Sequence, residues 1–462
     1  MNWLRIRLKN RKQFVCSAAL GAVLVLLAGG ANALAITRAQ TVWTVSKTSS
    51  VSACVYPSVT TCNTIGAAVS VAAPGDVILV GPGKYNESVY IDTNDLFLFG
   101  AQAGKDARFG RNDPSKESIV DATGQGSGPG GGAGFDIEKP YVVIDGFTIQ
   151  GGTSGSYAAG IYDDAQSPQI LNNIIQNNAV GVYLYFGYAL IEYNLFETNN
   201  KGTPGSHDYD IPGPGFGIVA DDDDGASITE NAFTGNLGAA ILAYEYDALT
   251  IAENSSVNDG SFVVLSVCQD IFFSQNQGRD FGAKGFLPVV GAAKADAAID
   301  VISDVEVSNT STYGNSDLQI EDNDLEEGGA SGYNGIAFST IAGVPNSDTA
   351  VCMYSKVRNN RISRFAGSGI VAEAWESGGT LFQSMISGND VKDNGNDGIL
   401  IGNAPNNYLN TLFGNKAGEN HVFDCADDTT GHLTLGTYDT WFNDLGGLSY
   451  PGRLCIFGSW QD

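Results

Sequence analysis

Basic residues are scarce in this chain of 462 residues, which has 24 Lys and Arg against 51 Asp and Glu and a formal net charge of −27. Such a chain is a poor partner for nucleic acid and for anionic membrane surfaces. The wide separation of its three histidines, His207, His421 and His432, argues against a zinc site of closely spaced ligands. After residue 35 no run is apolar enough to span a membrane. Carboxylates are in excess, and they suit either calcium binding or acid chemistry at a sugar.

The first 35 residues are predicted to be a secretory signal peptide. A basic start that ends at Lys12 precedes an apolar run from Phe14 to Leu27, and Ala33-Leu34-Ala35 is a small-residue cleavage site. A permanent membrane anchor is the alternative, but the apolar run is shorter than the roughly 20 residues that a spanning helix needs. We therefore expect a secreted or periplasmic protein that is cleaved near Ala35.

Cysteine is also sparse, with seven residues in the whole chain, and Cys16 leaves with the signal peptide. The six that remain are an even number in an oxidising compartment, which is typical of disulfides. Closeness in sequence favours the pairs Cys54–Cys62 and Cys425–Cys455. The two cysteines that remain then form the pair Cys268–Cys352.

A repeat is the most informative feature that the chain does have. Seven times an aliphatic or aromatic residue precedes an asparagine by three positions, and the shorter steps between these asparagines are about 22 residues, one coil of a solenoid. Stacked coils place such asparagines in a column, where their amides hydrogen-bond from coil to coil. The pattern predicts an all-β right-handed parallel β-helix. The asparagines are Asn173, Asn194, Asn231, Asn254, Asn276, Asn360 and Asn389, with Asn323 in an eighth copy.

One domain is expected, because a solenoid grows by adding coils. Residues 36–117 are predicted to form an N-terminal cap and the first coils, with an amphipathic helix at 63–73, N-capped by Asn63, and a strand at 77–80. Residues 118–416 are the β-helix, with loop excursions at 200–215, 278–316 and 340–350. Residues 417–462 are a disulfide-tied C-terminal cap.

Two segments resemble known proteins. The stretch from Thr64-Ile65-Gly66-Ala67-Ala68 through Pro74-Gly75-Asp76-Val77-Ile78 to Pro82-Gly83-Lys84-Tyr85-Asn86-Glu87 is similar to the opening of many secreted β-helix proteins. Pectin methylesterases, polysaccharide lyases and the periplasmic copper-site maturation proteins of nitrous oxide reductase begin in this way. The tail from Phe423 to Cys455 resembles the closing segment of secreted bacterial β-helix proteins. The chain thus looks like a bacterial β-helix repeat protein of the pectate-lyase-like superfamily, which implies a fold but no particular activity.

The activity motifs of two such families are missing. Gln269-Asp270-Ile271-Phe272-Phe273 departs from the Asp-Phe-Ile/Val-Phe-Gly motif of pectin methylesterases. Gly431-His432-Leu433 departs from the Gly-His-Gly of polygalacturonases, whose Asn-Thr-Asp is also absent. Neither activity is carried over to this chain.

Aligning the coils on a Gly-aliphatic step predicts an inward column and, three positions later, an outward strip of carboxylates and aromatics. Sugar rings stack on Tyr and Trp while carboxylates bind their hydroxyls, so the strip suits an extended polysaccharide. A solvated acidic face is the alternative. The inward residues are Ile161, Val182, Ile218, Ile241, Ile336, Ile370 and Ile399. The candidate substrate-binding residues are Asp164, Tyr185, Tyr244, Glu373 and Trp375.

Catalysis on a glycan requires either two carboxylates that flank the scissile bond or, in a lyase, a base with cations that neutralise a uronate. The candidate catalytic residues lie in the middle of the strip and in a loop beside it: Asp221, Asp222, Glu245, Asp247 and His207. Asp223 and Asp224 are candidate calcium ligands, with a plain acidic turn as the alternative. The one basic cluster among the coils is expected to pair with nearby acids: Lys356, Arg358, Arg361 and Arg364.

A second outward column, one residue after the inward one, is largely apolar and begins with Tyr162 and Tyr183. Soluble proteins rarely expose such a stripe, so loops of the chain are expected to cover it, with a second subunit as the alternative. Overall we expect a protein that acts on or binds extracellular polysaccharide, as a lyase or a glycoside hydrolase. A non-catalytic glycan-binding or structural protein is the other hypothesis, and the oligomeric state stays open.

Overall fold

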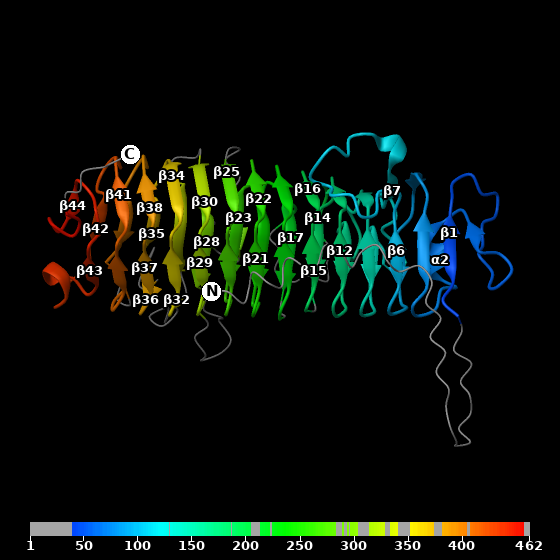
Figure 1. Cartoon of the computed structure of the whole chain (residues 1–462), viewed down its shortest axis with the longest axis horizontal. Helices are drawn as coiled ribbons and strands as arrows, with labels where there is room; N and C mark the ends of the chain where they lie inside the picture. Colours follow the sequence, from blue (N-terminus) through cyan, green and yellow to red (C-terminus); the bar gives the residue numbers. More distant parts are fainter. Residues whose placement is uncertain are drawn as a thin grey trace, which may run out of the picture. The chain divides into compact units, whose positions relative to one another are not determined.

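The computed structural model describes most of the chain after residue 38, and these residues form a solenoid of short parallel strands stacked coil on coil (Figure 1). The predicted signal peptide lies outside the described residues. No helix among the residues that are described is long and apolar enough to cross a membrane. The described ranges are 39–128, 130–185, 187–204, 213–221, 224–282, 289–290, 293–294, 296–303, 314–328, 333–340, 352–373, 381–403 and 407–456.

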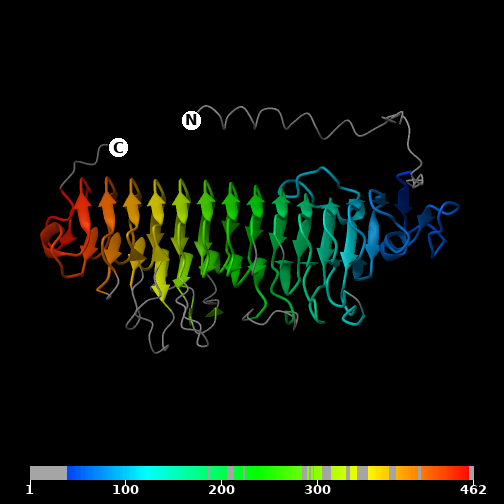
Figure 2. The ribbon, with the colours of Figure 1, turned by 90° about the horizontal axis from the view of Figure 1, so that it is seen from below.

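Three long parallel sheets form the faces of the solenoid, and Figure 2 shows their strands in a second view. Each coil contributes one strand to the third sheet, then one to the first and one to the second, before the chain returns to the third. Strands that are neighbours in a sheet therefore come from successive coils. The predicted parallel β-helix is confirmed.

The first sheet contains, in spatial order, β2 (Thr61–Cys62), β1 (Val42–Val45), β3 (Val77–Val80), β6 (Phe97–Phe99), β9 (Val143–Asp145), β12 (Gln169–Leu171), β15 (Leu190–Glu192), β18 (Ser227–Thr229), β21 (Thr250–Ala252), β24 (Phe272–Ser274), β29 (Gln319–Glu321), β33 (Lys356–Arg358), β37 (Met385–Ser387), β40 (Thr411–Phe413) and β43 (Thr440–Phe442). The second sheet contains β4 (Gly83–Tyr85), β7 (Ser118–Asp121), β10 (Phe147–Gln150), β13 (Ile174–Gln176), β16 (Leu195–Glu197), β19 (Ala232–Thr234), β22 (Ser255–Val257), β25 (Gln277–Phe281), β30 (Asp324–Gly328), β34 (Arg361–Phe365), β38 (Asp390–Lys392) and β41 (Lys416–Gly418). The third sheet contains β5 (Val89–Ile91), β8 (Phe135–Ile137), β11 (Ile161–Asp163), β14 (Val180–Leu184), β17 (Phe216–Asp221), β20 (Ala239–Tyr244), β23 (Ser261–Ser266), β28 (Ala297–Ser303), β31 (Asn334–Thr340), β35 (Ile370–Ala372), β39 (Ile399–Ile401), β42 (Cys425–Asp427) and β44 (Ser449–Tyr450).

Two smaller pairs and three short helical elements complete the described structure. The pair β26 (Val289–Val290) and β27 (Ala293–Lys294) is antiparallel, and β32 (Cys352–Met353) pairs in parallel with β36 (Leu381–Phe382). The helical elements are α2 (Ile65–Val69), η2 (Pro114–Lys116) and η4 (Thr434–Gly436).

The predicted asparagine column lies inside the corner between the first and second sheets, and we call it the first ladder. Each member donates an amide hydrogen bond to the side-chain oxygen of the next, at 2.7 to 3.2 Å from Asn173 as far as Asp444. The residue before each asparagine takes positive φ, as at Asn172 (52°) and Glu230 (53°), which turns the chain sharply. All eight predicted asparagines belong to this ladder, which also includes Asn415 and Asp444.

A second ladder, which the sequence analysis missed, lies inside the corner between the second and third sheets. It links Asn178, Asn199, Asn236 and Asp259 through amide hydrogen bonds of 3.0, 3.2 and 2.9 Å. Its signal was present, because Ile175, Phe196 and Phe233 each precede a ladder asparagine by three positions. The same spacing therefore marks both corners of a coil.

The N-terminal end of the core is covered by α2, whose Ile65, Ala68 and Val69 are buried. The helix is shorter than predicted, and its N-cap is Thr64 rather than Asn63. The Thr64 hydroxyl accepts from the Ala67 amide, and the Glu87 carboxylate accepts from the amides of Ile65 (3.0 Å) and Gly66 (2.9 Å). These oxygens satisfy the free amides of the first turn, which explains where the helix begins.

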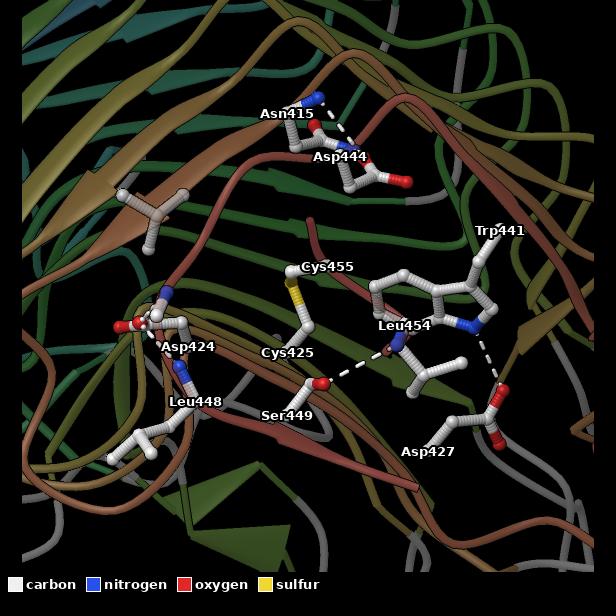
Figure 3. Close-up of a disulfide and its surroundings, with 12 residues drawn as sticks. Asn415, Asp424, Cys425, Asp427, Trp441, Asp444, Leu448, Ser449, Leu454 and Cys455 are labelled. Atoms are coloured by element: carbon white, nitrogen blue, oxygen red, sulfur yellow. Dashed lines mark hydrogen bonds between the residues drawn. A yellow bond between two sulfur atoms is a disulfide. The ribbon is translucent and has the colours of Figure 1, made fainter. Parts of the chain in front are cut away.

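The C-terminal end is fastened by the predicted disulfide Cys425–Cys455, shown in Figure 3, and the predicted Cys54–Cys62 bridge is also present near the other end. In the C-terminal cap the Trp441 indole donates to Asp427 at 2.8 Å, and Figure 3 shows the two side chains directed at each other.

The third predicted disulfide is wrong, because Cys268 and Cys352 are separate buried thiols. Gln269 pairs with Ser316 and Ser316 with Met353, so the two cysteines lie in one column with Asn315 between them. Two coils are about 10 Å, beyond the roughly 7 Å that a disulfide allows between α-carbons. The two cysteines were paired only because they remained after the other two pairs were assigned, and the sequence did not show on which coils they lie.

Candidate functional site

The third sheet contains the inward column from which the outward strip was predicted. Ile161 pairs with Val182, Val182 with Ile218 and Ile218 with Ile241, and all four are fully buried in the core. Val263 and Ile299 continue this inward column in two coils that the sequence alignment passed over. The outward strip therefore contains two more positions than predicted.

Those two positions interrupt the strip. Asp221 pairs with Tyr244 in the next coil, as predicted, and Tyr244 pairs with Ser266. Ser266 is buried, and its partner Ile302 is also buried. Glu373 follows these interruptions, so the structure does not bring it together with Asp221. The acidic and aromatic part of the strip is confined to the coils of Asp164, Tyr185, Asp221 and Tyr244.

The apolar outward column is buried within the single chain, in agreement with the prediction that the chain itself covers it. Tyr162 and Tyr183 stack in parallel with ring centroids 5.3 Å apart, and Tyr157 meets Tyr162 edge-on at 4.8 Å. The Tyr183 hydroxyl donates a short hydrogen bond to the Asp221 carboxylate. This bond joins Asp221 to the neighbouring coil of the third sheet.

Asp136 is a buried acid that the sequence analysis did not single out. It pairs with Tyr162 on the outward face, and its carboxyl oxygens have no hydrogen-bond partner among the described residues. Burial, and then the charges of Glu138 and Asp164, raise its pKa to about 7. A methyl group on Gly130 would meet Asp136 Oδ2 at 3.1 Å, so the glycine-rich loop covers the acid. No substrate reaches it in this arrangement.

A more open group of acids lies where the third sheet turns into the first, and we call it the acidic corner: Asp224, Asp247 and Asp270. Asp224 pairs with Asp247 in the next coil, and Asp247 pairs with Gln269, the neighbour of Asp270. The side chains of all three acids are exposed. Burial of part of the side chain, and then the charges of Asp224 and Asp270, raise the pKa of Asp247. Asp247 was predicted as a catalytic residue, and the structure gives it Asp224 as a neighbour.

An aromatic side chain that the sequence analysis missed stands beside these acids. Tyr188 is 60% exposed, and its amide donates to the Asp224 carbonyl at 2.9 Å. A side chain at Gly225 would meet the Tyr188 ring at 2.8 Å, so the glycine leaves room for the ring. The sequence feature that could have revealed this side chain is the alignment of Tyr188 with Gly225 in the next coil.

The other predicted site residues have mixed outcomes. Glu245 is exposed one residue beyond the strip, in a positive-φ conformation of 48°. Within the described part of the chain, no group of three or more His, Cys, Asp or Glu is arranged to hold a metal ion. The calcium site stays a prediction, because one of its ligands is not described. The predicted residues outside the described ranges are His207, Asp222, Asp223 and Trp375.

Two residues of the basic cluster, Arg358 and Arg364, pair with nearby acids as predicted. Arg358 forms a short ion pair with Glu321 in the preceding coil, and Arg364 forms one with Glu326. Both arginines are on the outer faces of the first and second sheets, away from the acidic corner. They neutralise protein carboxylates, which leaves them poorly suited to a uronate.

Comparisons with known proteins concern the architecture. The model of a family described as "Right handed beta helix region" matches residues 110–256 and 215–427. The structure resembles an alginate lyase from Paenibacillus sp. (12% identity, 71% of this chain and 92% of the other, TM-score 0.42). It also resembles a Family 28 exopolygalacturonase from Yersinia enterocolitica (9%, 88% and 78%, TM-score 0.45). A third similar structure is the catalytic unit of a GH87 alpha-1,3-glucanase from Streptomyces thermodiastaticus (13%, 83% and 65%, TM-score 0.42).

At identities this low and TM-scores below 0.5, these likenesses carry no information about the reaction of this chain. No curated protein matches its sequence.

Proposed function

We propose that this chain, which belongs to the right-handed β-helix family, is a secreted enzyme that hydrolyses polysaccharide at the acidic corner. The observation that carries the proposal is the pairing of Asp224 with Asp247 in adjacent coils, together with the raised pKa of Asp247. Glycoside hydrolysis needs one carboxyl that holds a proton and one that is ionised. Asp247 takes the role of the acid, and Asp224 supplies the second carboxyl group.

The spacing of the coils suits this pair. Successive coils are about 4.8 Å apart, close to the 5 to 5.5 Å between the two carboxyl groups of a retaining glycosidase. Because Asp224 and Asp247 occupy equivalent positions, they face the same edge of the solenoid. Tyr188 offers a ring face beside them, on which a sugar can stack.

Hydrolysis is favoured over lyase chemistry by the distribution of charge. A lyase needs a base and cations that neutralise a uronate carboxylate. The acidic corner supplies carboxylates, and Arg358 and Arg364 are paired with Glu321 and Glu326. A polyuronate would therefore meet like charge at this corner.

The experiment incubates the protein with neutral and uronate polysaccharides and measures both reducing ends and unsaturated products. We expect reducing ends only, and a loss of at least about a hundredfold in rate for Asp247→Asn and for Asp224→Asn. Asp317→Asn is the matched control, because Asp317 is exposed, has nearly the same positive φ as Asp270 (54° and 53°) and lies two coils beyond Asp247.

The alkaline limit of the reaction gives a second readout. Asp247 acts as an acid only while it is protonated, so its raised pKa extends activity to higher pH than an ordinary aspartate would. Full activity in both pair variants would contradict the proposal. Binding without any products, in the wild-type protein, would instead support the non-catalytic glycan-binding hypothesis.

A further inference from the structure

We infer that four aromatic side chains near the C-terminal end form a second binding surface for the same polysaccharide, an inference that rests on the proposed function. We call these side chains the aromatic row: Tyr354, Phe382, Tyr408 and Tyr438. Consecutive ring centroids are 6.3, 4.6 and 6.4 Å apart, and successive rings are tilted by 54° to 62°. The row is therefore continuous from one ring to the next.

Each ring of the row comes from a different coil. The Tyr354 amide donates to the Phe382 carbonyl at 3.2 Å, Phe382 pairs with Tyr408, and the Leu409 amide donates to the Tyr438 carbonyl at 3.0 Å. One aromatic per coil repeats about every 4.8 Å along the solenoid, which is close to the length of one sugar unit in an extended chain. Successive rings can thus meet successive sugars.

The row continues the edge that carries the acidic corner. Asp247 pairs with Gln269, Gln269 with Ser316 and Ser316 with Met353, while Met353 pairs with Phe382 through β32 and β36, whose labels are neighbours in Figure 1. A polymer that lies along this edge therefore leads from the acidic pair to the aromatic row. Five coil steps separate Asp247 from Tyr408, about 24 Å or roughly five sugars.

The end rings are available to a ligand, because Tyr354 is 50% exposed and Tyr438 is 48% exposed. Phe382 and Tyr408 are partly buried between them and hold the row in place. A ring that is already packed loses little side-chain entropy when a ligand binds. Four rings in contact therefore form a prepared stacking surface rather than four independent exposed aromatics.

Charge selects the class of polysaccharide. The described positions along this edge, from Asp224 to Tyr438, are acidic, amide, hydroxyl or apolar, and none of these paired positions is a base. The exposed carboxyl groups of Asp224, Asp247 and Asp270 lie close together and would repel a polyuronate. Stacking on aromatic faces, by contrast, requires no charge on the sugar. The occupant is therefore an uncharged polysaccharide in an extended conformation.

The experiment measures the affinity of the full mature chain for oligosaccharides of two to ten units. The probes are gluco- and manno-oligosaccharides, with oligogalacturonates of the same lengths as charged counterparts. Affinity for a neutral series is expected to rise with length until a chain spans the edge, at about six units or more. Tyr354→Ala and Tyr438→Ala should each weaken binding of the longest neutral chain about tenfold and leave the shortest unchanged.

The matched control is Phe442→Ala. Phe442 is 45% exposed and stacks on Phe413 at 5.2 Å, but it belongs to the outer face of the first sheet. Its removal should change no affinity. Thermal unfolding of each variant checks that the C-terminal coils remain folded.

The outcomes separate this inference from the proposed hydrolysis. Unchanged affinity in Tyr354→Ala and Tyr438→Ala, or stronger binding of oligogalacturonates than of neutral chains, would overturn the aromatic row as a glycan surface even if Asp247→Asn is inactive. Length-dependent binding that the tyrosine variants lose would support the row even if the protein releases no products. A dimer that Tyr438→Ala dissociates would assign the row to a second copy of the chain and overturn the inference.

Discussion

The two interior corners of the same coils are stabilised differently. The first ladder runs without a break from Asn173 to Asp444, whereas the second stops at Asp259 and resumes only at Asn394. In the gap Phe281 and Phe365 stack with centroids 6.5 Å apart. Each buried amide in such a column needs a hydrogen-bond partner in the next coil. Where aromatic rings fill the corner, their packing replaces the column of amides.

Both ladders end in the same way, on an aspartate. Asn236 donates to Asp259, Asn415 to Asp444, and Asn420 to Asp424. An asparagine accepts from the previous coil and donates to the next, whereas a carboxylate only accepts. Aspartate therefore suits the last position, where the following coil offers no amide oxygen to receive a hydrogen bond. An aspartate in ladder register therefore ends the first ladder at Asp444 and the first part of the second ladder at Asp259, whereas Asp424 lies only four residues after Asn420.

The largest effect is expected where the first ladder is interrupted at its centre, in Asn231→Leu. The Asn231 oxygen accepts from the Asn194 backbone amide (3.0 Å) and side chain (3.0 Å), and its own amide donates to Ile191 and Asn254. Leucine leaves several buried groups unpaired, at about 1 to 3 kcal/mol each. We expect the free energy of unfolding to fall by about 3 kcal/mol or more, as measured by chemical denaturation.

Asn396→Leu is the control for that experiment, because Asn396 is an exposed asparagine outside both ladders. Equal stability of the two variants would show that the ladder contributes nothing beyond its packing. Asn236→Leu extends the comparison to the second ladder, where a similar loss is expected because Asn236 makes the same kinds of bond.

A smaller, pH-dependent effect is expected at the end of the second ladder. Asp259 accepts from Asn236 and from the Ser256 hydroxyl, and burial raises its pKa to about 7. The folded state therefore binds a proton that the unfolded state, with an aspartate pKa near 4, releases. The stabilisation is complete below about pH 4 and is lost as the pH rises through 7.

Asp259→Asn should remove this pH dependence. Urea denaturation at pH 5 and pH 8 measures it, and the variant should be more stable than the wild type at pH 8 by roughly 2 kcal/mol, with a smaller difference at pH 5. An identical slope with pH in both proteins would mean that Asp259 does not titrate in this range.

The sequence predicted most of the fold because each predicted asparagine of the first ladder follows an apolar residue at a fixed spacing of three positions. Ile228 three positions before Asn231 identifies a corner without any knowledge of the neighbouring coil. The inward column was found in the same way, but Val263 and Ile299 were missed because no Gly-aliphatic step marks their coils. The predicted strip consequently lacked two positions. It placed Glu373 near acids from which the coils of Val263 and Ile299 separate it.

The site was less predictable, because it depends on which coils are neighbours. Asp247 was predicted, but its pairing with Asp224 and the place of Tyr188 follow from the register at a corner, where turn lengths differ from coil to coil. The disulfide error has the same origin. Cys268 and Cys352 share a column, but the coil of Asn315 lies between them. The long segment that separates the two cysteines in the sequence gives no sign of this intervening coil.

The smallest effect is expected at the last position of the first ladder, in Asp444→Asn. Asp444 accepts from the Asn415 backbone amide at 2.9 Å and side-chain amide at 2.7 Å, and burial raises its pKa to about 6. As at Asp259, the raised pKa stabilises the fold at low pH, and this contribution is lost as the pH rises through 6. The last coils of a solenoid contact neighbours on one side only and can open without unfolding the rest. We therefore expect a gain of about 1 kcal/mol or less in the variant at pH 8, visible as slower hydrogen exchange of the amides in β41 and β43 and hardly visible in global unfolding. A gain as large as that of Asp259→Asn would show that the C-terminal coils unfold together with the centre, and that the two ends of the ladders are equivalent after all.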